Sequence, residues 1–262
     1  MILINGYKVA KEILQPARRE ILDLKKRDII PFLAIIMAGD DKESSIYIGE
    51  KAKKAKEFGV KTQIFRLKSK TTTAELKKII TKLNYDKKIS GILVQLPLPK
   101  QINIDEILNT ILPEKEVDGI TPTSPYSPAC ATGIMKILAY YKIDPKEKKV
   151  VIVGRGRIVG RPLFVLMQKA AAHVVCISPK DENLVKLLNG ADIVVGAANL
   201  RDFIKKDMIK KGAVVIDAAK NVNNDVAEVA RYLTPRIGGV GPVTVAMLLK
   251  NVVDAARVLT NF

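Results

Sequence analysis

The strongest constraint on the fold is an apolar, β-branched run that leads directly into a glycine-rich loop. After one lysine, residues 149–153 (KVVIV) are all hydrophobic, which is typical of a strand buried on both faces of a parallel sheet. Gly154, Gly156 and Gly160 follow in the spacing G-x-G-x-x-x-G, and a helical stretch begins after them. Such glycines let the backbone approach a pyrophosphate, which a helix N-terminus binds through its N–H groups. The segment therefore predicts a dinucleotide-binding unit; the alternative is a glycine-rich turn without a ligand.

Three further apolar runs extend this pattern through the second half of the chain. They lie at residues 173–177, 192–196 and 213–217, with helical stretches between them. Strands that alternate with helices in this way predict a doubly wound, Rossmann-like parallel sheet. A long amphipathic helix is expected at residues 243–260.

The first half of the chain alternates in the same manner. Strands are expected at residues 31–37, 60–67 and 91–96, and helices at 44–58, 71–83 and 104–110. Ser44 or Ser45 is the expected N-cap of the first of these helices, and Gly59 its C-terminal residue. The order β-α-β-α-β implies a second parallel sheet with helices on its faces.

A proline-rich stretch at residues 113–128 separates the two halves, and a helix at 133–141 leads into the second. The predicted fold class is therefore α/β, with two α/β domains and a cleft between them. We expect one domain at residues 1–120, joined by the C-terminal helix 243–262, and the other at residues 121–242.

Composition excludes several classes of protein. Of the 262 residues only His173 is a histidine, so a metal site with several histidines is impossible and no metal is expected. Cys130 and Cys176 provide no disulfide framework, which favours a reducing, cytoplasmic location. No stretch reaches the roughly 18 consecutive apolar residues that a membrane-spanning helix needs, so no membrane partner is expected.

The formal net charge of +17 permits two interpretations. One is a nucleic-acid or membrane partner, and the other is a small anionic ligand on a lysine-rich surface. Aromatic residues make up only 5% of the chain and tryptophan is absent, so the chain is poorly supplied with side chains that stack on bases. We therefore favour small anionic ligands and expect no nucleic acid.

The residues that follow the second strand of the predicted dinucleotide-binding unit bear on the choice between NAD and NADP. NAD-binding sites usually carry an Asp or Glu at this position, which binds the ribose 2′-hydroxyl. Here Ser178 and Lys180 follow the strand without a carboxylate at its tip, and Arg155 lies in the glycine-rich loop. These side chains could hold a 2′-phosphate, so NADP is predicted in preference to NAD. The alternative is that they are solvated loop residues.

Four polar residues in the first half could carry chemistry. Tyr47 and Lys51 are four residues apart in an expected helix and so lie on one face, where a phenol and an amine together can relay protons. Gln95 interrupts an apolar strand near its carboxyl end, where α/β proteins bind ligands. Asp118 lies just before the proline-rich boundary and could pair with a ring rich in N–H groups. Each position taken singly could equally be structural.

Taken together, the motifs resemble the bifunctional methylenetetrahydrofolate dehydrogenase/cyclohydrolase family over nearly the whole chain. The matching segments are Gly39-Asp40-Asp41 through Ser45-x-Tyr47-x-x-x-Lys51, GILVQLPLP at 91–99, Lys115-Glu116-Val117-Asp118-Gly119, Gly154-Arg155 with Ile158-Val159-Gly160-Arg161-Pro162, and GGVGPVT at 238–244. The nine residues of GILVQLPLP and the GGVGPVT run are specific enough to make coincidence very improbable.

The resemblance implies a substrate and a role for each residue. It implies oxidation of 5,10-methylenetetrahydrofolate with NADP and hydrolysis of the product to 10-formyltetrahydrofolate, in one-carbon metabolism. Lys51 matches the catalytic lysine, Gln95 the residue that tunes it, and Tyr47 the aromatic that packs on the folate. Asp118 matches the carboxylate that binds the pterin. A folate-binding catalytic domain, a Rossmann-like NADP-binding domain and a homodimer are also implied.

Further sites follow from the same resemblance. Gly238 and Pro242 are expected at the substrate, because the glycines of this run would allow close backbone approach to the folate or nicotinamide. The expected cofactor-binding residues are Gly154, Arg155, Gly156, Ile158, Ser178 and Lys220. Lys220 departs from the family, which is apolar at this position, and the choice between a phosphate contact and exposure to solvent stays open. The other functions considered are a monofunctional nicotinamide dehydrogenase and a dinucleotide sensor or nucleic-acid-binding module.

Overall fold

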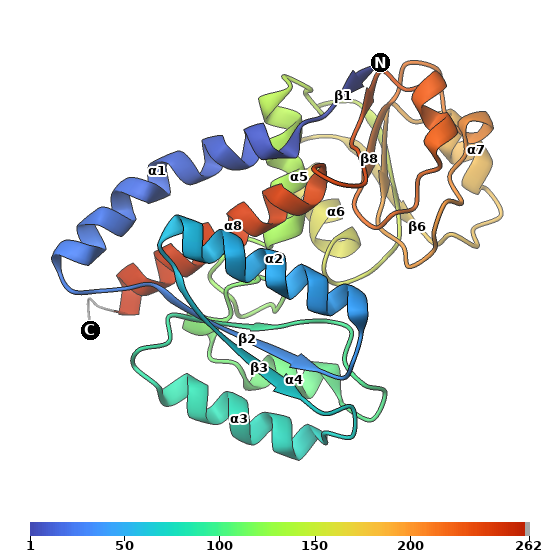
Figure 1. Cartoon of the computed structure of the whole chain (residues 1–262). Coiled ribbons are helices and arrows are strands. Elements are labelled where there is room, and N and C mark those ends of the chain that lie inside the picture. Colours follow the sequence, from blue (N-terminus) through green and yellow to red (C-terminus); the bar gives the residue numbers. More distant parts are fainter. Residues whose placement is uncertain (260–262) are drawn as a thin grey trace. The chain divides into compact units, whose positions relative to one another are not determined.

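The structure is a computed structural model that describes residues 1–259, and its chain forms two compact units (Figure 1). The six-stranded unit comprises Met1–Ile13 and Pro128–Met247. The three-stranded unit comprises Leu14–Ser127 and the described residues from Leu248 onward. Each unit is built around its own parallel sheet, as the alternation of strands and helices predicts.

The six-stranded unit has the strand order β1-β9-β8-β7-β5-β6, in which every neighbouring pair is parallel. Its strands are β1 (Ile2–Leu3), β5 (Lys149–Val153), β6 (His173–Ile177), β7 (Ile193–Gly196), β8 (Val214–Asp217) and β9 (Tyr232–Leu233). Its helices are α5 (Ala129–Tyr140), α6 (Gly160–Lys169), α7 (Leu184–Asn189) and the 3-10 turns η2 (Lys206–Met208) and η3 (Asn224–Glu228). The predicted Rossmann-like sheet is confirmed.

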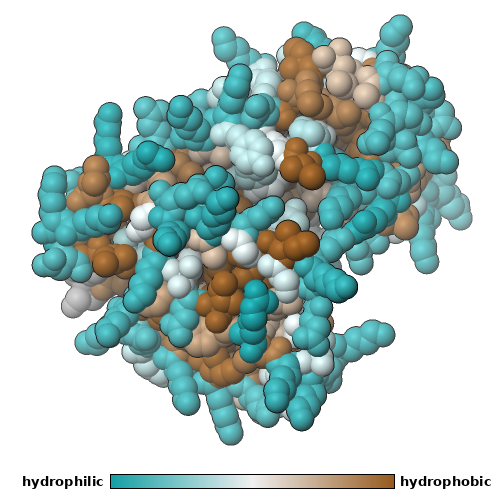
Figure 2. Space-filling model, viewed as in Figure 1, coloured by the Kyte–Doolittle hydropathy of each residue, from teal (hydrophilic) through white to brown (hydrophobic). Residues whose placement is uncertain are grey.

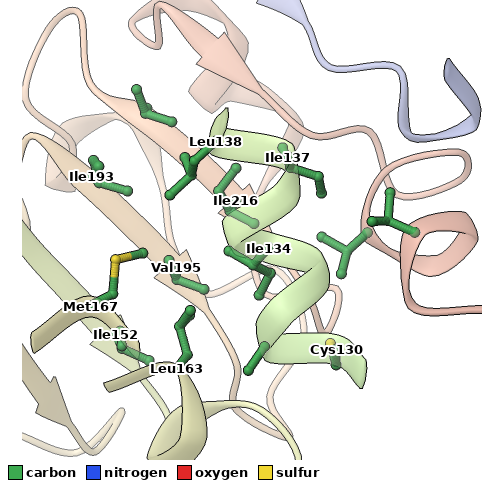
Figure 3. Close-up of a cluster of buried hydrophobic side chains, with 14 of the residues drawn as sticks. Cys130, Ile134, Ile137, Leu138, Ile152, Leu163, Met167, Ile193, Val195 and Ile216 are labelled. Carbon is green, nitrogen blue, oxygen red and sulfur yellow. The ribbon is translucent and has the colours of Figure 1, made fainter. Parts of the chain in front are cut away.

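The central strands of this sheet are buried on both faces. Val150 and Ile152 of β5 pack toward α5 and α6, where they join a cluster that includes Ile134, Leu163 and Ile216 (Figure 3). Alternate side chains of β5 point to the opposite face and pack around α7 and the two 3-10 turns. Burial on both faces requires an uninterrupted apolar strand, which explains the KVVIV run.

The three-stranded unit has the strand order β3-β2-β4, again parallel. Its elements are β2 (Phe32–Ala38), α2 (Lys42–Phe58), β3 (Lys61–Leu67), α3 (Thr73–Tyr85), β4 (Gly91–Val94), α4 (Ile104–Thr110) and η1 (Pro113–Lys115). All seven residues of the central strand β2 are buried. Helices α3 and α4 pack on one face of the sheet, and α2 lies on the other (Figure 1).

The observed helix caps match only some of the caps predicted from the sequence. Gly59 ends α2 in the left-handed conformation, as predicted. The predicted N-cap at Ser44 or Ser45 is wrong, because Asp41 caps α2 by accepting a hydrogen bond from the Ser44 N–H. Thr72 caps α3 and forms a reciprocal capping box with Glu75.

The units differ from the predicted domains at both termini. The first 13 residues belong to the six-stranded unit because β1 pairs in parallel with β9. Two long helices contribute residues to both units, namely α1 (Gly6–Lys26) and α8 (Val240–Leu259). Helix α8 begins three residues earlier than predicted, and its expected continuation to residue 262 lies outside the described residues.

Hydrophilic side chains cover most of the face shown in Figure 2, and exposed apolar residues are scattered among them. This distribution agrees with a chain that carries 44 Lys and Arg residues. Along residues 1–259, no helix combines the length and the apolarity needed to cross a bilayer.

The glycine-rich loop yields a stability prediction with a built-in control. A Cβ added at Gly160 would overlap the carbonyl oxygen of Gly154, whereas a Cβ at Gly156 would meet no atom within 4 Å. We expect Gly160→Ala to lower the free energy of unfolding by roughly 2–4 kcal/mol and Gly156→Ala to change it by less than about 0.5 kcal/mol. Urea denaturation followed by far-UV circular dichroism would measure both. Equal stability of the two variants would contradict this account of the loop.

Candidate active site

The polar centre of the three-stranded unit lies where β4 ends. Gln95 follows the last residue of β4, and its backbone N–H still bonds to the Ile36 carbonyl of β2. Its side-chain Nε2 donates to the Leu96 carbonyl at 2.7 Å, which leaves Oε1 to accept from Lys51 Nζ at 2.8 Å. The amide thus orients the half-buried amine of Lys51, which α2 carries. The structure therefore brings together two residues that the sequence singled out.

Tyr47 and Asp118 belong to the same centre. Tyr47 lies one helical turn before Lys51 on α2 and is 40% exposed. Asp118 follows a segment that bridges to β4 through Glu116 and Ile92. Burial raises the pKa of Asp118, and the nearby Lys51 ammonium opposes that shift. An amine, a phenol, an amide and a carboxylate are thus available for binding a polar ring and moving a proton.

In the six-stranded unit, the glycine-rich loop has the features of a phosphate-binding turn. Gly154 has a φ of +123°, a conformation that L side chains rarely adopt. Helix α6 begins at Gly160, and no side chain caps its N-terminus. The Arg161 N–H donates to the Gly156 carbonyl at 3.0 Å, and a Cβ at Gly156 would meet no atom within 4 Å. The open space beside Gly156 at the start of α6 suits an anionic group such as a pyrophosphate.

Cationic side chains surround this loop at the carboxyl ends of β5 and β6. Arg155 Nε donates to the Cys176 carbonyl at 2.9 Å, and Arg161 Nε donates to the Arg155 carbonyl at 3.1 Å. Ser178 follows β6, where its hydroxyl accepts from the Lys180 N–H, and Ile158 is partly exposed in the loop. This donor set fits an anionic dinucleotide.

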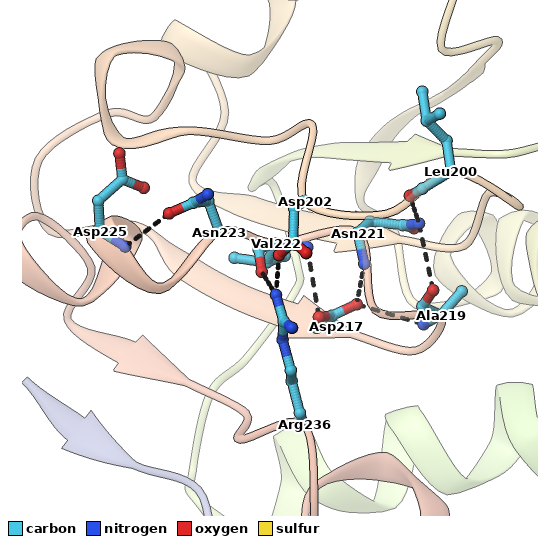
Figure 4. Close-up of polar contacts among 9 residues, drawn as sticks. All are labelled: Leu200, Asp202, Asp217, Ala219, Asn221, Val222, Asn223, Asp225 and Arg236. Carbon is cyan, nitrogen blue, oxygen red and sulfur yellow. Dashed lines mark hydrogen bonds and ion pairs between the residues drawn. The ribbon is translucent and has the colours of Figure 1, made fainter.

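A network of buried polar groups supports the neighbouring loops (Figure 4). Asn221 is fully buried; its Oδ1 accepts from the Ala198 N–H, and its Nδ2 donates to the Ala198 and Leu200 carbonyls. Asp217 accepts from the backbone N–H groups of Ala219, Asn221 and Val222. These bonds join the loops that follow β7 and β8. The sequence does not single out either residue. Its only signal is that Asp217 ends an apolar run and Asn221 follows four positions later.

Lys220 lies within the turn that Asp217 and Asn221 hold. Its φ of +62° places it in the left-handed region, and its carbonyl accepts from the Asp202 N–H at 3.1 Å. Asp202 also forms an ion pair with Arg236, which donates to the Val222 carbonyl. The structure thus places Lys220 at the carboxyl end of β8, two strands away from β5 in the sheet.

The glycine run at 238–241 packs against the chain's own N-terminal segment. Gly238 has a φ of +81° and accepts a hydrogen bond from the Gly6 N–H, and Tyr7 lies against it. A Cβ at Gly239 would overlap the Pro235 carbonyl oxygen. The sequence indicates that the backbone of this run is closely approached. At least part of that close contact is made by other residues of this protein. Pro242 lies in the first turn of α8.

Comparison with known proteins decides the family. A model of the tetrahydrofolate dehydrogenase/cyclohydrolase catalytic domain matches residues 4–118, and a model of the NAD(P)-binding domain of the same family matches residues 128–260. The chain belongs to the tetrahydrofolate dehydrogenase/cyclohydrolase family. It is an enzyme of folate metabolism with a catalytic domain and an NAD(P)-binding domain, as the motifs predict.

Individual relatives agree with this assignment over nearly the full length. The bifunctional protein FolD of Thermodesulfovibrio yellowstonii is 39% identical, covering 97% of this chain and 96% of the relative. A crystal structure of the FolD dehydrogenase/cyclohydrolase from Campylobacter jejuni is 35% identical with a TM-score of 0.91, covering 98% of this chain and 99% of that one. The Trypanosoma brucei FolD structure, complexed with NADP and an inhibitor, is 31% identical with a TM-score of 0.94, covering 100% and 99%.

The burial of Asp118 leads to a prediction about pH. The family resemblance implies that Asp118 binds the pterin, and a carboxylate in that role must be ionised to accept hydrogen bonds. Burial raises the pKa of Asp118 above its ordinary 3.8. We expect kcat/KM for the folate substrate to fall on the acid side with an apparent pKa above 3.8. Asp118→Asn should lower kcat/KM and remove this acid limb, whereas Asp23→Asn on the exposed face of α1 should leave it unchanged. An acid limb that persists in Asp118→Asn would contradict the prediction.

Proposed function

We propose that Lys51, oriented by Gln95, transfers protons in the second of two coupled reactions. The enzyme oxidises 5,10-methylenetetrahydrofolate to the 5,10-methenyl cation and then adds water to give 10-formyltetrahydrofolate. The observation that supports this role most directly is the 2.8 Å hydrogen bond from Lys51 Nζ to Gln95 Oε1. It holds the amine in one direction beside Asp118, in a unit whose sequence matches the family's catalytic domain.

In the hydrolysis, water adds to the methenyl carbon and loses a proton, and the bond from that carbon to N5 then breaks as N5 gains a proton. One amine that alternates between its neutral and charged forms can serve both transfers. Gln95 favours a fixed position of the amine, and Tyr47, partly exposed one turn away, packs against the folate ring system. Gly238 and Pro242 are proposed to contact the substrate as well.

Asp118 is proposed to bind the pterin. The pterin amino group and ring N–H are donors, and an ionised carboxylate accepts two parallel hydrogen bonds from such a pair. The Lys51 ammonium favours the ionised form of Asp118, so the two groups support each other's charge before the substrate binds.

The NAD(P)-binding domain is proposed to prefer NADP. Gly154, Gly156 and the N-terminus of α6 would hold the pyrophosphate, and Ile158 would contact the dinucleotide. Arg155 and Ser178, at the end of β6, would hold the 2′-phosphate, and Lys220 would supply a further cation. The bound cofactor would supply the acceptor for the hydride that leaves the methylene carbon.

We also propose that the enzyme is a cytoplasmic homodimer. The family resemblance supports the dimer, and the two free cysteines, Cys130 and Cys176, support a reducing compartment.

The assigned role of Lys51 can be tested by following the methenyl product by absorbance. With methylenetetrahydrofolate and NADP, the wild type should form the product and then consume it. Lys51→Ala should slow hydrolysis of added methenyltetrahydrofolate by roughly a hundredfold or more. Lys53→Ala, an exposed change two residues away on α2, should behave as the wild type. Retained hydrolysis in Lys51→Ala would sink the role, and a wild type that oxidises without hydrolysing would indicate a monofunctional dehydrogenase.

The cofactor preference depends on Arg155. Arg155→Ala should raise the KM for NADP roughly tenfold, because a guanidinium bonds strongly to a phosphate dianion, and should change the KM for NAD much less. Lys169→Ala at the exposed C-terminus of α6 provides the control. Initial rates with each cofactor at saturating folate would measure the four constants. A wild type that prefers NAD, or equal effects on both cofactors, would overturn the assignment.

A further inference from the structure

A carboxylate is buried beneath the loop that carries Asp118. Glu116 is only 1% exposed. Its Oε1 accepts from the backbone N–H groups of Asp118 at 3.1 Å and Gly119 at 3.2 Å. Its Oε2 accepts from the N–H groups of Ile120 at 3.0 Å and Thr121 at 3.2 Å, and from the Thr121 hydroxyl at 3.2 Å. One side chain thus satisfies four successive peptide N–H groups.

This arrangement shapes the loop and does not neutralise a cation. All five donors are uncharged and belong to residues 118–121. A carboxylate has about four lone-pair positions, so its accepting capacity is used by this one turn. Gly119 within the turn has a φ of +71°, so a left-handed residue that favours glycine follows directly after Asp118. Burial raises the pKa of Glu116, and the bonds from Thr121 oppose this shift.

The backbone of Glu116 is itself tied to the strand that leads to Gln95. Glu116 forms a parallel bridge with Ile92 of β4, and β4 ends at Val94. Its carbonyl accepts from the Ser124 hydroxyl at 2.7 Å. A single residue therefore connects the strand that presents Gln95 to the loop that presents Asp118.

We propose that Glu116 is a positioning residue for pterin recognition, which acts by holding Asp118 in register with Lys51 and Gln95. The inference rests on the proposed function, because the pterin is the ligand that Asp118 would bind. Glu116 itself does not touch the substrate. Since its carboxylate fixes the N–H of Asp118 and of the next three residues, it sets the direction of the Asp118 side chain.

The defining experiment compares Glu116→Gln with Asp118→Asn and the double variant. Both oxygens of Glu116 accept from backbone N–H groups, so in either orientation the amide NH2 of glutamine faces other donors and the turn must shift. We expect the KM for methylenetetrahydrofolate to rise roughly tenfold in Glu116→Gln while the KM for NADP stays unchanged. If Glu116 acts through Asp118, the double variant should be no worse than Asp118→Asn alone. Independent, multiplying effects on KM would overturn the proposal.

Matched variants separate positioning from general loss of stability. Asn84→Ala removes another buried polar side chain of the same unit, which bonds to the Thr110 carbonyl and the Leu112 N–H. It should lower the melting temperature without raising the KM for the folate. Glu116→Asp, which keeps the charge, should give a KM between those of the wild type and Glu116→Gln. If Glu116→Gln fails to fold, Thr121→Val removes a single donor and should raise the same KM about twofold to threefold.

Different results would count against the proposed function and against the positioning role of Glu116. An inactive wild type would count against the proposed function, whereas an active wild type with an unchanged folate KM in Glu116→Gln would overturn only the positioning role. Amide hydrogen exchange tests the loop without any activity. Residues 118–121 should exchange faster in Glu116→Gln than in the wild type, and unchanged protection of this turn would also overturn the proposal.

Discussion

The central strands of each sheet are buried on both faces, and this leaves the strand ends as the place for polar chemistry. All seven residues of β2 are buried, and β5 alternates its side chains between two apolar clusters. A polar group within these strands would lose its hydration, so the polar groups that can act on a ligand follow the last residues of the strands. Gln95 follows β4, Arg155 follows β5, and Lys220 follows β8. The same constraint therefore places both the proposed proton-transfer centre and the proposed dinucleotide site.

Both units use a buried carboxylate to shape a neighbouring loop. Glu116 binds the N–H groups of residues 118–121, and Asp217 binds those of Ala219, Asn221 and Val222. In each case burial raises the carboxyl pKa, and backbone donors oppose the shift. Peptide N–H groups stabilise a buried charge without a cation, and in return the charge fixes several peptide planes at once. A loop held in this way would fix the direction of a side chain that it carries, as proposed for Asp118.

Much of the framework was predictable because local patterns determine it. The KVVIV run and the other apolar runs predict the main strands of both sheets to within a few residues, and Gly59 marks the end of α2. Non-local pairing explains the omissions. Strand β1 has only two residues and forms by pairing with β9, some 230 positions away. Helix α1 carries Pro16 in its interior, which obscures its pattern. The prediction that a serine caps α2 is wrong because several adjacent polar residues could act as the N-cap. Only the backbone conformation in the folded chain makes Asp41 the cap.

By itself, the sequence determined the family, the α/β fold class and the side chains most suited to chemistry, because these depend on residue types and spacing along the chain. It could not show that Lys51 and Gln95 share a hydrogen bond, since 44 positions separate them. Nor could it show that Glu116, Asp217 and Asn221 organise the loops, because a buried acid and an exposed one look alike in a sequence. Burial and partners decide the role of a polar residue, and both come from segments that only the tertiary structure brings together.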